Sequence, residues 1–249
     1  MKTSIRWLGH STVLLQHNDT RILTDPVLRR RVAHLWRRVP LPETDWPGRV
    51  DAILISHLHW DHLDLPTLRR LGNDQLVFVP RGARDWLVRR GFGRVRELGV
   101  GDREQIGDFV ISAVPADHSG RRPPFGPTAD AVGYMLGGAQ RIYFPGDTDL
   151  FDGMTELGFD LDVALMPIWG WGSTLGAGHL DPIRAAEATR RLHPQIVIPI
   201  HWGTFHPIGM GRGGAHFLEE PPIRFASAVH LAAPEVTVRI LAPGETLVL

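Results

Sequence analysis

Short apolar runs separated by turn-forming residues recur along this chain, a pattern typical of β-structure. In the first third, runs of β-branched or alternating apolar residues predict three strands, at residues 4–8, 12–17 and 21–24. Later apolar runs are short enough to be buried strands. They predict strands at residues 51–56, 76–80, 109–114, 131–136, 141–144, 163–166, 196–200, 236–241 and 246–248.

Four segments predict helices, at residues 64–71, 83–90, 182–192 and 222–231. The clearest begins at Asp181-Pro182, because Asp181 can cap the helix and Pro182 suits its first position. The sequence contains no internal repeat and no obvious linker, so we expect one domain over residues 1–249. The order of elements predicts an α/β fold, with strand-rich halves and helices outside, or a four-layer αββα sandwich.

Composition limits the possible chemistry of the protein more than it limits the possible folds. Lys plus Arg and Asp plus Glu number 27 each, so no overall charge attracts nucleic acid. The chain lacks a signal-peptide pattern and any run near the ~18 apolar residues of a membrane span, so we expect a cytoplasmic protein. It also has no cysteine. Any bound metal must therefore be held by nitrogen and oxygen ligands.

The strongest candidate site is the run His57-Leu-His59-Trp-Asp61-His62, directly after an expected buried strand. In extended backbone, residues i and i+2 point to the same side, so His57 and His59 can reach one metal together. Asp61 and His62 follow a turn and can face a second position. Such groups are costly to bury unpaired, so the cluster predicts a metal or catalytic site rather than a polar surface loop.

Three further segments each place a potential ligand after a strand: His118, Asp147 and His201. Taken singly, each is more typical of a turn or surface residue. Taken together they support one another, because loops at one edge of a scaffold are where sites are usually built.

This set of residues resembles the metallo-β-lactamase superfamily, whose H-x-H-x-D-H signature matches residues 57–62. The resemblance covers about residues 5–206 and implies the four-layer sandwich. It also implies two metal sites. The first ion would be held by His57, His59 and His118, the second by Asp61, His62 and His201, with Asp147 bridging both. Segments 7–12, 23–26, 144–148, 179–182 and 200–205 resemble the branch of ascorbate-6-phosphate lactonase and N-acylphosphatidylethanolamine-hydrolysing phospholipase D.

The function expected from this resemblance is hydrolysis of a phosphodiester, a lactone or a related ester, on a small-molecule or lipid-like substrate. Two ions about 3.5–4 Å apart can share a bridging hydroxide and polarise the reacting oxygen. The ligand set suits Zn²⁺, while Mn²⁺ or Fe²⁺ would also be satisfied. Two alternatives stay open: a redox di-iron protein and a non-catalytic metal-binding module on the same fold. Homo-oligomer formation is also left open.

Three residues are candidates for catalysis beyond metal binding. Asp61 would orient the hydroxide. His179, by the resemblance, would contact substrate or act as a general acid, against a capping or surface role. His10 would be an anchor or proton donor, against a hydrogen-bonded turn residue. Asp25 is a candidate brace for a metal-bound histidine, and Thr148 could act similarly through its hydroxyl.

Two surrounding segments each allow alternative roles. Trp169 and Trp171, beside glycines, predict an apolar wall for a substrate group, which Trp60 could extend, or else a packed loop. The basic run at residues 29–38 predicts a solvated helix face, or a surface that guides an anionic substrate or touches phospholipid. Residues 209–214 are expected to be a flexible connection.

Overall fold

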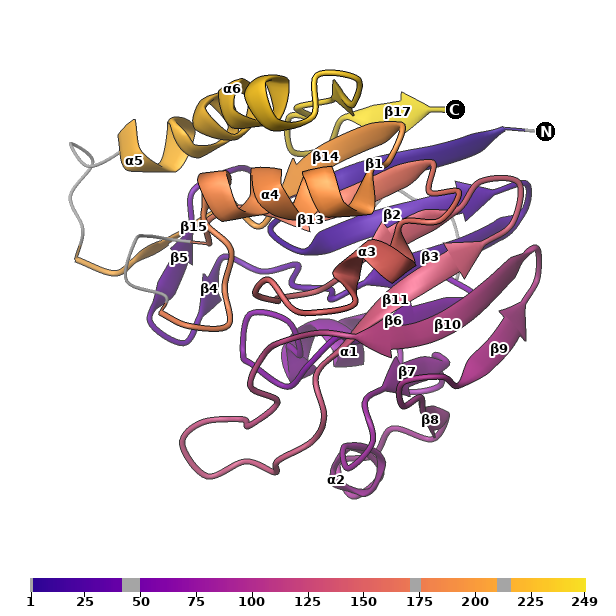
Figure 1. The fold of residues 1–249 in the computed structure, drawn as a ribbon. Helices are drawn as coiled ribbons and strands as arrows, with labels where there is room; N and C mark the ends of the chain where they lie inside the picture. The colour runs from indigo at the N-terminus through magenta and orange to yellow at the C-terminus, as the bar shows by residue number, and fades with distance from the viewer. Residues whose placement is uncertain (1, 42–49, 171–175, 210–215) are drawn as a thin grey trace.

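The computed structural model describes residues 2–41, 50–170, 176–209 and 216–249. Within these residues, two mixed seven-stranded sheets lie face to face (Figure 1). The first sheet has the order β17 (Thr246–Val248), β1 (Thr3–Gly9), β2 (Thr12–His17), β3 (Thr20–Thr24), β6 (Ala52–Leu54), β7 (Val77–Val79) and β8 (Val95–Glu97). The second has the order β16 (Thr237–Val238), β14 (Ile196–Ile200), β13 (Val163–Pro167), β12 (Ile142–Phe144), β11 (Val132–Gly137), β10 (Phe109–Pro115) and β9 (Arg103–Ile106).

Helices cover the outer faces of both sheets. The first sheet packs against α1 (Leu65–Leu71) and α2 (Arg84–Val88). The second packs against α3 (Met154–Leu157), α4 (Pro182–Leu192) and α6 (Pro221–Ala232), with the short α5 (His216–Glu219) beside α6 (Figure 1). The largest apolar cluster joins the inner faces of the two sheets. The four-layer sandwich expected from the sequence is therefore confirmed.

The ends of α1 and α4 follow from their sequences. Asp181 accepts hydrogen bonds from the backbone N–H groups of Ile183 and Arg184, as expected of its capping position, and Pro182 opens the helix. Asp64 caps α1 in the same way by accepting from the Thr67 N–H. Among the described residues, no helix is both long and apolar enough to cross a membrane.

The basic run at residues 29–38 differs from the expected helix face. It forms the hairpin of β4 (Arg31–Val32) and β5 (Leu35–Arg37), which joins β15 (Phe205–Pro207) in a third, small sheet. The helix prediction was wrong because apolar spacing at Val32 and Leu35 also suits a two-residue turn. In the hairpin both side chains pack against Phe205. Arg37 is buried and donates hydrogen bonds to the backbone carbonyls of Leu8 and Val27.

Candidate metal centre

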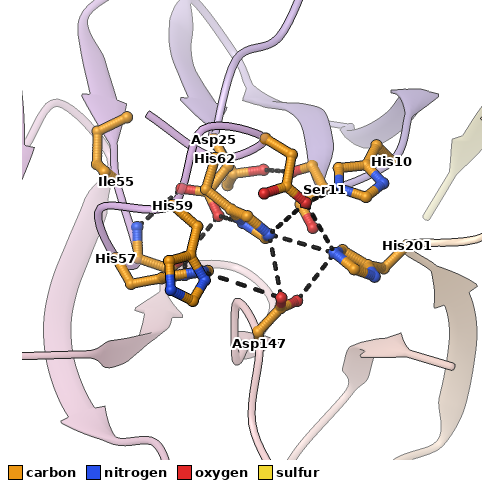
Figure 2. Close-up of polar contacts among 12 residues, drawn as sticks. His10, Ser11, Asp25, Ile55, His57, His59, His62, Asp147 and His201 are labelled. Atoms are coloured by element: carbon orange, nitrogen blue, oxygen red, sulfur yellow. Dashed lines mark hydrogen bonds and ion pairs between the residues drawn. The ribbon is translucent and has the colours of Figure 1, made fainter. Parts of the chain in front are cut away.

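Four segments that leave strand ends meet at one edge of the sandwich. Residues 55–63 follow β6, His118 follows β10, Asp147 follows β12, and His201 follows β14. Strands β10, β12 and β14 run in the same direction, because β11 is antiparallel to both β10 and β12 and β13 is parallel to β12 and β14. Their carboxyl ends therefore lie at the same edge. Figure 2 shows the labelled histidines and Asp147 pointing toward one another.

Gly146 allows two of these segments to approach closely. Its φ of +64° lies in the left-handed region that favours glycine. A Cβ atom at this position would lie 2.3 Å from the Cβ of Ser56. The absence of a side chain at residue 146 thus brings Asp147 against the segment that carries the first histidines.

Three imidazole nitrogens form the first group of potential ligands, the three-histidine cluster. His59 Nδ1 lies 3.0 Å from His57 Nε2. The same atom lies 3.1 Å from His118 Nε2. Each residue thus offers one nitrogen to a common point, as the sequence analysis expected for a first ion.

The second group, the mixed cluster, combines His62, His201, Asp61 and Asp147. The Nε2 atoms of His62 and His201 are 3.2 Å apart. Asp147 Oδ2 lies 3.2 Å from His62 Nε2, and Asp147 Oδ1 lies 3.1 Å from His201 Nε2. Asp61 Oδ2 lies 3.6 Å and 3.7 Å from the same two nitrogens.

These separations fit metal ions. A tetrahedral ion with bonds of about 2.0–2.1 Å places its ligands about 3.3–3.4 Å apart, close to the nitrogen–nitrogen and nitrogen–oxygen distances in both clusters. Asp147 Oδ2 is also 4.0 Å from His57 Nε2, so its carboxylate lies between the two clusters. The structure thus brings together all seven residues that the sequence analysis named as ligands.

The outer nitrogens of three histidines contact protein groups that determine which nitrogen carries hydrogen. His62 Nδ1 lies 2.7 Å from Asp25 Oδ2 and His118 Nδ1 lies 2.7 Å from the Gly178 carbonyl, and both acceptors require an N–H. His57 Nδ1 lies 3.0 Å from Ser56 Oγ, whose own hydrogen goes to Asp25. The Nε2 lone pairs therefore point into the clusters, as metal ligands require.

Burial and charge act in opposite directions across the centre. Burial lowers the pKa of His118 to about 4 and holds the pKa of His57 well below its usual range. Burial also acts to lower the pKa of His62, but the carboxylates of Asp147, Asp61 and Asp25 raise it well above its usual value. The pocket around His62 therefore favours a positive charge, which a divalent ion can supply in place of a proton.

His10 contacts Asp61 and is 1% exposed. Its Nε2 is 2.8 Å from Asp61 Oδ2, and because a carboxylate accepts, this nitrogen donates. Burial lowers the pKa of His10 to about 3, so the ring is neutral. Thr204 Oγ1 accepts a hydrogen bond from the His10 backbone N–H at 2.7 Å. This geometry matches the anchor role considered for His10.

His179 lies at the outer side of the centre. Its ring is 4.7 Å from that of His118, and its Nε2 is 3.6 Å from Asp147 Oδ2. Its side chain is 18% exposed, unlike the deeply buried His57 and His62. It faces a small cavity lined by Asp147, Thr148, Pro167, Trp169, His179, Leu180 and His201. The structure thus places it at the more exposed side of the centre, beside Asp147 and His118.

Two of the three tryptophans expected near the mouth lie within the described residues. Trp169 lines the small cavity. Trp60 is half-exposed, donates from its indole nitrogen to the Pro123 carbonyl, and has the Arg122 guanidinium 4.5 Å from its ring. Trp171 lies outside the described residues, as does most of the 209–214 connection.

Similarity to known proteins identifies the family of the chain. A family model, the beta-lactamase superfamily domain, matches residues 20–202, more than half of the 249-residue chain. The chain belongs to the β-lactamase superfamily. The resemblance stated from the sequence motifs is thereby confirmed.

Relatives within the superfamily cover most of the chain. A metal-dependent hydrolase of Methanopyrus kandleri is 30% identical over 97% of this chain and 98% of its own length. N-acyl-phosphatidylethanolamine-hydrolyzing phospholipase D 1 of Caenorhabditis elegans is 31% identical over 82% of this chain and 64% of its own. A solved metallo hydrolase from Ignicoccus hospitalis shares 25% identity with a TM-score of 0.77, covering 100% of this chain and 99% of that one. The potential ligands meet at the strand ends, and the chain belongs to the superfamily. Together these two findings support a metal-dependent hydrolase.

Two residues that contact the ligand segment, Arg122 and Ser56, were not predicted as part of the centre. Arg122 is buried and donates from Nη1 to the carbonyls of Leu58, at 2.7 Å, and Leu63, at 3.0 Å, at either end of the ligand run. No sequence signal marks Arg122, because it lies far along the chain in an irregular loop. Ser56 could have been noticed, since it directly precedes His57.

Proposed function

We propose that the protein is a hydrolase that holds two divalent metal ions and cleaves a phosphodiester, a lactone or a related ester. The observation that carries this proposal is that the Asp147 carboxylate, within the mixed cluster, also lies 4.0 Å from His57 of the three-histidine cluster. One ion would be held by His57, His59 and His118, the other by Asp61, His62 and His201, with Asp147 shared. We propose Zn²⁺ as the physiological metal, with Mn²⁺ and Fe²⁺ as alternatives that the same donors accept.

Hydrolysis requires an activated water and stabilisation of the charge that develops on the substrate. Bound divalent ions lower the pKa of water and polarise a phosphoryl or carbonyl oxygen. The chain's own contribution starts with Asp61, whose carboxylate would accept a hydrogen bond from the attacking water and orient it. His10 keeps the Asp61 carboxylate in place through the 2.8 Å hydrogen bond from Nε2. We therefore assign His10 to positioning rather than to proton transfer.

His179 is the proposed contact to the reacting group on the substrate side. It is partly exposed and lies beside the shared carboxylate of Asp147. The Nε2–H group of His179 would donate a proton to the leaving oxygen, which is the task of a general acid. The indole of Trp169 in the same cavity would contact an apolar part of the substrate. The similarity to a phospholipid-cleaving enzyme supports ester and phosphodiester substrates with apolar groups.

The proposal is tested by His59→Ala, which removes the nitrogen shared by two contacts of the three-histidine cluster. Chelated protein is reconstituted with each candidate metal, metal content is measured, and turnover of bis(p-nitrophenyl) phosphate and a panel of lactones is followed. Wild-type protein should hold two ions per chain. The variant should hold one and lose about 100-fold or more in turnover, since an ion contributes several kcal/mol to catalysis.

Three results would contradict the proposal. Full turnover in His59→Ala would remove this residue from the site. An iron pair with reversible redox chemistry and no hydrolysis would favour the di-iron alternative, and bound metal without any turnover would favour a metal-binding module. His230→Ala is the matched control, because His230 is an exposed residue of α6 and should leave metal content and turnover unchanged.

A further inference from the structure

Asp149 lies two residues after Asp147 and is buried, and its side chain contacts residues outside both clusters. Asp149 Oδ1 pairs with the guanidinium of Arg184 on α4 and accepts the Leu150 N–H at 2.7 Å. Asp149 Oδ2 accepts the backbone N–H of Gly178 at 3.3 Å. One carboxylate therefore joins the first turn of α4 to the segment before His179.

Gly178 connects this carboxylate to the three-histidine cluster. Its carbonyl accepts the hydrogen bond from His118 Nδ1 at 2.7 Å. Its φ is +84°, and a Cβ atom there would lie 3.0 Å from the same Nδ1. The peptide at Gly178 thus has little freedom to move without turning the His118 ring, and the next residue in the chain is His179.

Backbone contacts reinforce the same connection. The Asp149 N–H donates to the Asp117 carbonyl at 2.9 Å. The Asp117 N–H donates to Thr148 Oγ1 at 3.0 Å. The segments carrying His118 and Asp147 are therefore tied together at the residue that also holds Gly178.

We propose that the Asp149–Arg184 pair is a positioning device: through Gly178 it sets the ring orientation and tautomer of His118 and the place of His179. This inference rests on the proposed function, in which His118 is a metal ligand. Partners that orient metal-bound histidines typically contribute 10–100-fold to metal affinity. Because the Asp149 side chain reaches Gly178 and, through its carbonyl, His118, loss of this carboxylate should weaken binding of the ion at the three-histidine cluster and leave binding of the other ion unchanged.

A purely structural ion pair would behave differently. It would stabilise the start of α4, and its loss would lower the melting temperature and affect the two ions alike. The decisive quantity is therefore the ratio of the two metal affinities, which global destabilisation does not change.

The experiment uses Asp149→Asn and Arg184→Met in the full chain, with Arg184→Lys as the conservative variant. Metal-free protein is titrated with Zn²⁺ against a chromogenic chelator, and folding of each variant is checked by circular dichroism. We expect Asp149→Asn to lower the Zn²⁺ affinity of one site about tenfold or more and to leave the affinity of the other site within about twofold of the unmodified value. Arg184→Met should act in the same direction, and Arg184→Lys should recover part of the affinity.

Two comparisons identify the ion concerned. In a His59→Ala background, which retains only the mixed cluster, Asp149→Asn should have no further effect on Zn²⁺ affinity. Glu187→Gln is the control, because Glu187 pairs with Arg190 and Arg191 on the exposed side of α4 and should leave both affinities unchanged.

The positioning role would be overturned if the variants lost Zn²⁺ affinity equally at both sites. It would also be overturned if folded Asp149→Asn and Arg184→Met kept both affinities unchanged. Failure of the proposed function is seen separately, in the wild-type titration. If unmodified protein does not bind two Zn²⁺ ions, the dinuclear centre itself is wrong, whatever the variants show.

Discussion

Replacing Asp25 by Asn should lower both the stability of the folded protein and the metal affinity of one site. Asp25 is fully buried, and its two oxygens accept three hydrogen bonds. Oδ1 accepts the Ser56 N–H at 2.7 Å. Oδ2 accepts from Ser56 Oγ at 2.6 Å and from His62 Nδ1 at 2.7 Å. Asn has the same shape but exchanges one oxygen for an NH₂ group, so a donor must face a donor in either orientation.

The magnitude follows from these contacts. A hydrogen bond to a charged group contributes about 1.5–3 kcal/mol, and a buried donor left unsatisfied costs about 1–3 kcal/mol. One lost bond with its unsatisfied partner therefore amounts to about 3 kcal/mol. For a chain of this size, that corresponds to a melting temperature lower by about 6–12 °C. Loss of the carboxylate that accepts from His62 Nδ1 should also lower the metal affinity of the mixed cluster about 10–100-fold.

Thermal unfolding of metal-free protein and Zn²⁺ titration measure the two effects separately. Asp181→Asn is the matched control, since Asn caps a helix about as well as Asp and residue 181 lies at the exposed start of α4. If Asp25→Asn melts within about 1 °C of the unmodified protein and binds both ions normally, the reasoning from buried charge-assisted hydrogen bonds is refuted.

Two further substitutions probe the centre. His179→Ala should lower turnover with both ions retained, whereas His230→Ala should not; a fall in metal content of His179→Ala would instead make this residue a ligand. Gly146→Ala should abolish metal binding or folding, because its Cβ would lie 2.3 Å from the Cβ of Ser56 and the segment carrying Asp147 would have to shift. Metal analysis and circular dichroism report both outcomes, and normal metal content in Gly146→Ala would contradict the close-approach argument.

Much of the architecture was predictable because strand and helix signals are local. The buried strand before His57 appears as a continuous apolar run, and the cap of α4 appears as Asp181-Pro182. Ligands that directly follow strands were predictable for the same reason, since strand ends at one sheet edge lie together. The hairpin at residues 31–37 was not predictable. Its apolar spacing suits a helix equally well, and the choice was made by packing against Phe205, about 170 residues later.

The sequence by itself determined the fold family and the seven potential ligands, because the H-x-H-x-D-H run and the strand-end residues are contained within short segments. Tertiary structure alone decided the hydrogen bonds around those ligands: from His10 to Asp61, from Arg122 to the backbone of the ligand run, and from Gly178 to Asp149. The physical reason is that each of these contacts joins segments 29 to 64 residues apart. Such contacts depend on the folded arrangement of the sheets and leave no local pattern along the chain.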